Sequence, residues 1–81
     1  EYSTASLSML KDVYIQGPVL VIDDILATGG TLNAVGKLLE LGWKIKPEDQ
    51  IHAVIANLDF LPGKKFLTDQ GYTVEHLLNF D

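Results

Sequence analysis

The sequence predicts an α/β domain with a parallel sheet, and three observations support this fold class. Residues 19–22 form a continuous apolar run rich in β-branched side chains, which is typical of a strand inside a parallel sheet. Apolar residues then recur at helical spacing over residues 32–41. Two further apolar stretches follow, at residues 51–58 and 72–80, with a short helical stretch between them. Because parallel strands are joined by helical crossovers, this order predicts neighbouring parallel strands with right-handed connections.

The first predicted elements lie on either side of Gly17-Pro18. Residues 5–10 alternate small or polar side chains with apolar ones, which predicts a half-exposed strand at a sheet edge. After Gly17-Pro18, residues 19–22 show no polar alternation, so we expect a strand covered on both faces. Asp23 and Asp24 then stand at the carboxyl end of this strand.

A glycine-containing loop and a helix come next. Residues 27–30 continue a strand poorly, and the helical spacing over residues 32–41 ends at Gly42. The stretch 44–50, which contains Pro47, is expected to be a polar connection between helix and strand.

The remaining chain predicts a strand, a short helix and a last strand. Residues 51–58 are expected to be a buried strand, residues 64–70 a helix after the Pro62-Gly63 turn, and residues 72–80 an extended segment after Gly71. Three parallel strands with two helices leave open edges and one uncovered face. We therefore expect further strands from upstream residues or from a partner subunit.

Composition narrows the function classes. The chain has 81 residues, of which 47% are apolar, so it forms one small domain at most. Six basic against eleven acidic residues give a net charge of −5, which disfavours binding to nucleic acid. There is no cysteine, so disulfides and thiolate metal sites are excluded. No apolar run approaches the roughly 20 residues that cross a bilayer, and we expect a cytoplasmic protein without membrane contact.

The pattern after the first buried strand indicates a sugar phosphate site. Ligands of open α/β sheets bind at the carboxyl ends of strands, where Asp23 and Asp24 are expected. Gly29 and Gly30 allow a tight turn that gathers backbone N–H groups, and the following helix presents its positive end to an anion. Carboxylates repel phosphate but accept hydrogen bonds from sugar hydroxyls. The lysine of a Walker loop and the spacing of a Rossmann glycine motif are both absent.

Residues 19–32 resemble the phosphoribosyl diphosphate signature of type I phosphoribosyltransferases, with the sequence Val-Leu-Val-Ile-Asp-Asp-Ile-Leu-Ala-Thr-Gly-Gly-Thr-Leu. The resemblance implies that the acidic pair contacts the ribose hydroxyls, that the loop holds the 5-phosphate, and that Ile25 forms one side of the base pocket. The implied substrate-binding residues are Asp23, Asp24, Ile25, Leu26, Ala27, Thr28, Gly29, Gly30 and Thr31.

Within this family the chain is most similar to adenine phosphoribosyltransferases. Ala27 stands where hypoxanthine and guanine enzymes usually carry an aspartate. Glu1-Tyr2 resembles the base-facing glutamate and tyrosine of the adenine enzymes, which implies a catalytic Glu1, although Ser3-Thr4 replaces the glycine and lysine that often follow. The tail is also similar, in Leu61-Pro62-Gly63-Lys64-Lys65 and in the last five residues.

The resemblance implies an enzyme of purine salvage. It would transfer the 5-phosphoribosyl group from phosphoribosyl diphosphate to adenine, giving AMP and diphosphate, with Mg²⁺ bound mainly through the substrate and no dedicated protein metal site. It also implies a homodimer. Residues 1–81 would be the carboxyl-terminal part of one Rossmann-like phosphoribosyltransferase domain, with residues 1–16 as a flexible-loop strand and residues 17–81 as a β-α-β-α-β core.

Two alternatives to adenine transfer stay open. The sugar phosphate loop is shared by phosphoribosyltransferases for other bases, and regulators that sense phosphoribosyl diphosphate without turning it over carry the same motif. Outside the motif, His52 and His76 lie in predicted strands without spaced partners, so we expect both to be structural.

Overall fold

The computed structural model describes residues 16–81, which form a parallel three-stranded sheet with two helices and a short 3₁₀ helix. The strand order is β1-β2-β3, and both pairs are parallel, so the predicted α/β fold class is confirmed. The edge strand predicted at residues 5–10 lies outside the described residues. The elements are β1 (Val19–Leu26), α1 (Gly30–Trp43), η2 (Pro47–Asp49), β2 (Gln50–Leu58), α2 (Gly63–Asp69) and β3 (Thr73–Phe80).

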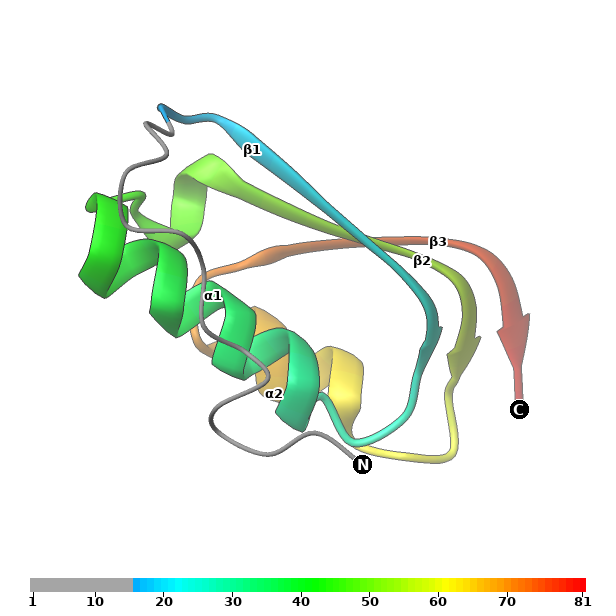
Figure 1. The fold of residues 1–81 in the computed structure, drawn as a ribbon. Helices are drawn as coiled ribbons and strands as arrows, with labels where there is room; N and C mark the ends of the chain where they lie inside the picture. Colours follow the sequence, from blue (N-terminus) through cyan, green and yellow to red (C-terminus); the bar gives the residue numbers. More distant parts are fainter. Residues whose placement is uncertain (1–15) are drawn as a thin grey trace.

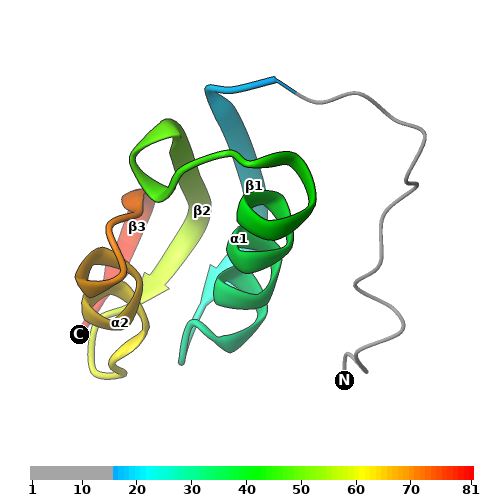
Figure 2. The same cartoon turned by 90° about the vertical axis from the view of Figure 1, so that its left-hand side faces the viewer.

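Both helices lie on the same face of the sheet, as Figures 1 and 2 show. The apolar core is the layer between the helices and this face, and removing its side chains from water supplies the main driving force for folding. The buried cluster draws on β1, β2, β3, both helices and the residue before β3. Its members are Leu26, Leu32, Val54, Leu67, Tyr72 and Val74, with Val21 packed against them.

The opposite face of the sheet is exposed in the described structure. In the strand register it carries five large apolar side chains, with exposed fractions from 38% to 80%, which we call the open sheet face: Leu20, Ile22, Ile51, Ile55 and Leu77. The prediction that residues 19–22 are covered on both faces is therefore wrong, because both helices pack on one side. The expectation of one uncovered face is confirmed.

The strands bend near their carboxyl ends, as Figure 1 shows. The alternation of buried and exposed side chains shifts by one residue at this bend. In β1 the shift leaves Ile25 53% exposed and Leu26 buried, and in β2 it moves the buried position from Val54 to Asn57. The bend turns the end of β1 towards the loop that leads into α1.

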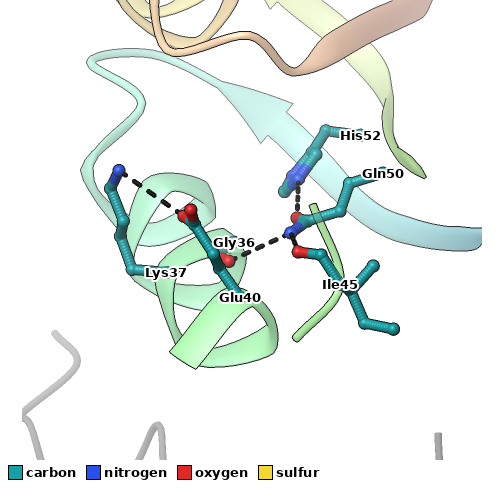
Figure 3. Close-up of polar contacts among 6 residues, drawn as sticks. All are labelled: Gly36, Lys37, Glu40, Ile45, Gln50 and His52. Carbon is teal, nitrogen blue, oxygen red and sulfur yellow. Dashed lines mark hydrogen bonds and ion pairs between the residues drawn. The ribbon is translucent and has the colours of Figure 1, made fainter. Parts of the chain in front are cut away.

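The connection between α1 and β2 is more than the polar linker predicted for residues 44–50. It contains the 3₁₀ helix η2, and Ile45 and Gln50 are buried. The side-chain amide of Gln50 donates hydrogen bonds to the carbonyls of Gly36 and Ile45, each at 3.1 Å. Figure 3 shows these bonds, which tie the start of β2 to the middle of α1 and to the connection that follows the helix. A linker sequence does not reveal them because they need the folded register.

His52 extends this buried network, as Figure 3 shows. Its Nε2 lies 2.9 Å from the amide oxygen of Gln50. Because that oxygen can only accept, Nε2 donates and carries the proton. The His52 ring also lies 4.8 Å from the Tyr72 ring, measured between centroids. Burial lowers the pKa of His52 below its usual value of 6.5. The placement of His52 agrees with the structural role expected for it.

Candidate sugar phosphate pocket

A cavity of about 200 Å³ opens at the carboxyl end of β1. Ten consecutive residues line it, from Asp23 in β1 through the loop to Leu32 in the first turn of α1. All nine substrate-binding residues implied by the resemblance are among them. Leu32 is the one lining residue that sequence reasoning left out. It is 3% exposed and belongs to the core cluster, and an apolar residue at a first core position of a helix gives no signal of ligand contact.

The two carboxylates of the pocket are oriented by the backbone beside them. One oxygen of Asp23 accepts a hydrogen bond from the N–H of Asp24 at 2.8 Å, and one oxygen of Asp24 accepts from the N–H of Ile25 at 2.8 Å. Such bonds between an aspartate and the neighbouring backbone fix the side-chain rotamer. Among residues 16–81, no further hydrogen bond engages the second oxygen of either carboxylate. Each of these oxygens can therefore accept a hydrogen bond from a ligand hydroxyl.

The loop turns into α1 at Gly29. Its φ of 87° and ψ of 0° place it in the left-handed region, which glycine adopts without strain. Gly29 is also the N-cap residue, and no side chain caps the helix. Thr31 is the second residue of α1 and lies inside its first turn, so it does not cap the helix.

The amino end of α1 faces the pocket with unmatched backbone donors. The first N–H groups of any helix lack intrahelical acceptors, and here neither a side-chain cap nor an acidic residue in the first turn satisfies them. The N–H groups of Gly30, Thr31 and Leu32 are of this kind, and these residues line the cavity. Helix N–H groups together with the helix dipole favour an anion at this position.

The loop is supported from behind by α2. The N–H of Gly63, at the start of α2, donates a hydrogen bond to the carbonyl of Ala27 at 3.0 Å. No residue of α2 lines the cavity in the described structure. The loop therefore lies between α2 and the cavity.

The sequence singled out three further residues, Glu1 as catalytic and His52 and His76 as structural. Glu1 is outside the described residues. His52 and His76 face the layer of helices and do not line the cavity. In the part of the chain that the structure describes, no group of three or more His, Cys, Asp or Glu side chains could hold a metal ion. In the same part, no helix is long and apolar enough to cross a membrane.

No protein-family model matches the chain. It is 41% identical over 81 residues to the adenine phosphoribosyltransferase of Pelagibacter ubique, covering 99% of this chain and 45% of that protein. The chain thus spans about 45% of the length of the curated relatives it matches.

Two solved structures have a similar fold. The crystal structure of the Giardia lamblia enzyme APRTase, complexed with 9-deazaadenine, matches with a TM-score of 0.75 at 28% identity over 88% of this chain and 39% of that chain. The adenine phosphoribosyltransferase of Thermoanaerobacter pseudethanolicus matches with a TM-score of 0.67 at 34% identity, over 86% and 39%. The resemblance to adenine phosphoribosyltransferases is confirmed, and the fold corresponds to part of theirs.

Proposed function

We propose that the pocket binds the ribose 5-phosphate part of phosphoribosyl diphosphate, and that the protein transfers this 5-phosphoribosyl group to adenine. One observation carries the proposal: carboxylates, a glycine turn and an uncapped helix start line the same cavity. Carboxylates suit hydroxyls and backbone N–H groups suit phosphate, so this donor and acceptor set fits a sugar phosphate. The names of the similar proteins support adenine as the acceptor base.

In this proposal each part of the pocket has a separate task. Asp23 and Asp24 accept hydrogen bonds from the ribose hydroxyls and so fix the sugar ring. The backbone of Ala27, Thr28, Gly29, Gly30 and Thr31, together with the two threonine hydroxyls, holds the 5-phosphate. Ile25, which is 53% exposed, offers an apolar surface to the base. Holding the sugar at both ends lowers the entropic cost of reaching a reactive geometry.

The reaction forms a bond from adenine N9 to C1 of the ribose and breaks the bond from C1 to diphosphate, giving AMP. Positive charge develops on the ribose ring as diphosphate leaves, and the carboxylates beside the ring stabilise that charge. Glu1 is proposed to handle a proton near the base. The pocket offers two carboxylates, so Mg²⁺ would be held mainly through oxygens of the substrate and would supply positive charge that neutralises the leaving diphosphate.

We place residues 17–81 as the core of the carboxyl-terminal part of one phosphoribosyltransferase domain, and the role expected for residues 1–16 concerns a segment that lies almost wholly outside the described residues. The protein acts in purine salvage in the cytoplasm as a homodimer, and its partners are adenine, phosphoribosyl diphosphate, AMP and diphosphate.

Replacing either carboxylate tests the ribose contact. Asp23→Asn and Asp24→Asn each put an N–H₂ donor where an acceptor is needed, so we expect ribose 5-phosphate binding to weaken about tenfold or more. Calorimetric titration of the purified protein measures this. The matched control is Asp49→Asn, which makes the same chemical change in η2 at the opposite end of the sheet and should keep the wild-type affinity. Equal affinity in all three variants would contradict the proposal.

Turnover of different bases tests the acceptor. Adenine should be converted to AMP in the presence of phosphoribosyl diphosphate and Mg²⁺, and hypoxanthine and orotate should not be used. Preferential use of another base would identify a different phosphoribosyltransferase. Binding of phosphoribosyl diphosphate without turnover of any base would instead favour a sensing protein.

A further inference from the structure

The loop between β1 and α1, residues 27–29, which we call the phosphate loop, contacts the first residue of α2 through a backbone hydrogen bond. Gly63 is buried, and its N–H donates to the carbonyl of Ala27 at 3.0 Å. A Cβ atom on Gly63 would lie 2.4 Å from that carbonyl oxygen, 3.0 Å from its carbon and 2.8 Å from Cδ1 of Leu26. Real Cβ atoms do not approach other atoms that closely, and a backbone carbonyl cannot rotate away as a flexible side chain can. Only glycine fits at this position without moving the loop.

The hydrogen bond sets the direction of a peptide plane in the pocket. The peptide joining Ala27 to Thr28 is trans, because the one cis peptide in residues 16–81 is Gly17-Pro18. In a planar trans peptide the C=O and N–H groups point in opposite directions. Since the Ala27 carbonyl points to α2, the N–H of Thr28 points away from α2, towards the cavity that Thr28 lines. Rotating this plane would bring a carbonyl oxygen to the phosphate and remove a donor.

A second contact holds the next part of the loop. A Cβ atom on Gly29 would lie 3.1 Å from the carbonyl oxygen of Gly63 and 3.1 Å from Cδ2 of Phe66. Gly29 in its left-handed conformation therefore sits directly against the first turn of α2. The loop is restrained at both Ala27 and Gly29 by residues that lie more than thirty positions later in the sequence.

We propose that Gly63 is a positioning residue of the phosphate site: it fixes the peptide between Ala27 and Thr28 so that a backbone N–H points to the 5-phosphate. Phe66 supports the same loop from α2 by packing against Gly29. Neither residue touches the cavity. The inference rests on the proposed function, since it assigns a task within the binding of the phosphate.

The test is the Gly63→Ala variant of the full chain, labelled with ¹⁵N. We expect ribose 5-phosphate to bind about tenfold more weakly, because small displacements of positioning groups are costly, and the amide signals of Thr28 and Gly29 to shift in the free protein. Gly36→Ala is the matched control, since its Cβ would lie 2.5 Å from the Tyr72 ring, away from the loop. That variant should lose stability but keep, at a temperature where it is folded, the wild-type affinity and loop signals.

The affinity of the Gly63→Ala and Gly36→Ala variants for ribose 5-phosphate decides whether Gly63 positions the loop. A folded Gly63→Ala protein with wild-type affinity overturns the inference, and so does an equal loss of affinity in Gly36→Ala. If Gly63→Ala does not fold, the wild-type chain supplies the readout: the amide signal of Thr28 is followed while ribose 5-phosphate is added. A Thr28 amide that shifts as the ligand saturates supports the inference, because its N–H is the donor that the Gly63 contact with Ala27 directs to the phosphate, and a Thr28 amide that does not shift overturns it. If the wild-type chain fails to bind ribose 5-phosphate, the proposed function fails first and the inference with it.

Discussion

At the scale of single residues, His52 and Gln50 form a buried hydrogen-bonded pair between α1 and the sheet. The structural role of His52 was predictable because no other metal-ligating or catalytic residue stands at a suitable spacing. Its hydrogen bond with Gln50 was not predictable, because Gln50 lies next to a connection that looks polar along the chain. By contrast, Asp23 and Asp24 were placed correctly beside the glycine loop, since neighbours in sequence are neighbours in this pocket.

His52 should make the stability of the fold depend on pH. Burial lowers its pKa below 6.5, so the unfolded chain binds a proton more readily than the folded chain. The free energy of unfolding should therefore fall as the pH drops through about 6.5 towards the folded-state pKa, and level off below that value. Urea denaturation across this range measures the slope.

Two substitutions separate the effect of His52 on the pH dependence of the free energy of unfolding from the effect of other titratable groups. His52→Gln retains a donor for Gln50 but has no titratable group, so the fall in stability below about 6.5 should be smaller than in the wild type. His76→Gln is the same change at the other histidine and should retain the His52 contribution. A wild-type slope in His52→Gln would contradict the explanation.

At the scale of elements, close packing of α1 on Tyr72, the residue before β3, explains a glycine in the middle of the helix. Helical spacing alone placed α1 from Leu32 onward, whereas the helix begins at Gly30, two residues earlier. Glycine is a poor helix former, so its presence at position 36 has no local reason. The reason is long-range: Gly36 packs against Tyr72, which is 3% exposed.

The same substitution at two places in α1 should have opposite effects. Gly36→Ala forces a Cβ against a ring that is held between α1 and His52, so we expect a loss of about 1–3 kcal/mol in the free energy of unfolding. Gly42→Ala meets no atom within 4 Å and should raise it by up to about 1 kcal/mol, through higher helix propensity. Urea denaturation of both variants checks the pair. A similar change in both would show that propensity alone decides.

For the whole molecule, the open sheet face is the dominant feature. The order of elements was enough to predict three parallel strands and an uncovered side. It could not show that residues 19–22 are covered on one face only. A continuous apolar run is compatible with helices on one face of the sheet or on both. Ile22 is 71% and Leu77 80% exposed, far more than large apolar side chains in a closed α/β sheet.

This face should bind an apolar dye. We expect the purified chain to enhance the fluorescence of ANS, because contiguous exposed apolar surface binds such dyes and is uncommon on monomeric proteins. Ile22→Thr and Leu77→Thr place a less hydrophobic side chain that favours strands at each position. A variant with both substitutions should show weaker ANS fluorescence. Circular dichroism confirms that the fold is retained. Absence of dye binding by the folded wild-type chain would contradict this picture.

Ten consecutive residues, 23–32, line the pocket, so evolution can move the whole set of lining residues between proteins in one step. A site formed by one continuous segment can be transferred to another protein whole. Copying residues 23–32 with the strand before them and the helix after them copies every residue that lines the cavity. The support behind the loop lies outside this segment, because it comes from Gly63 and Phe66 of α2. Grafting the segment onto another α/β scaffold should therefore transfer sugar phosphate binding only when the host also supplies a glycine behind the turn.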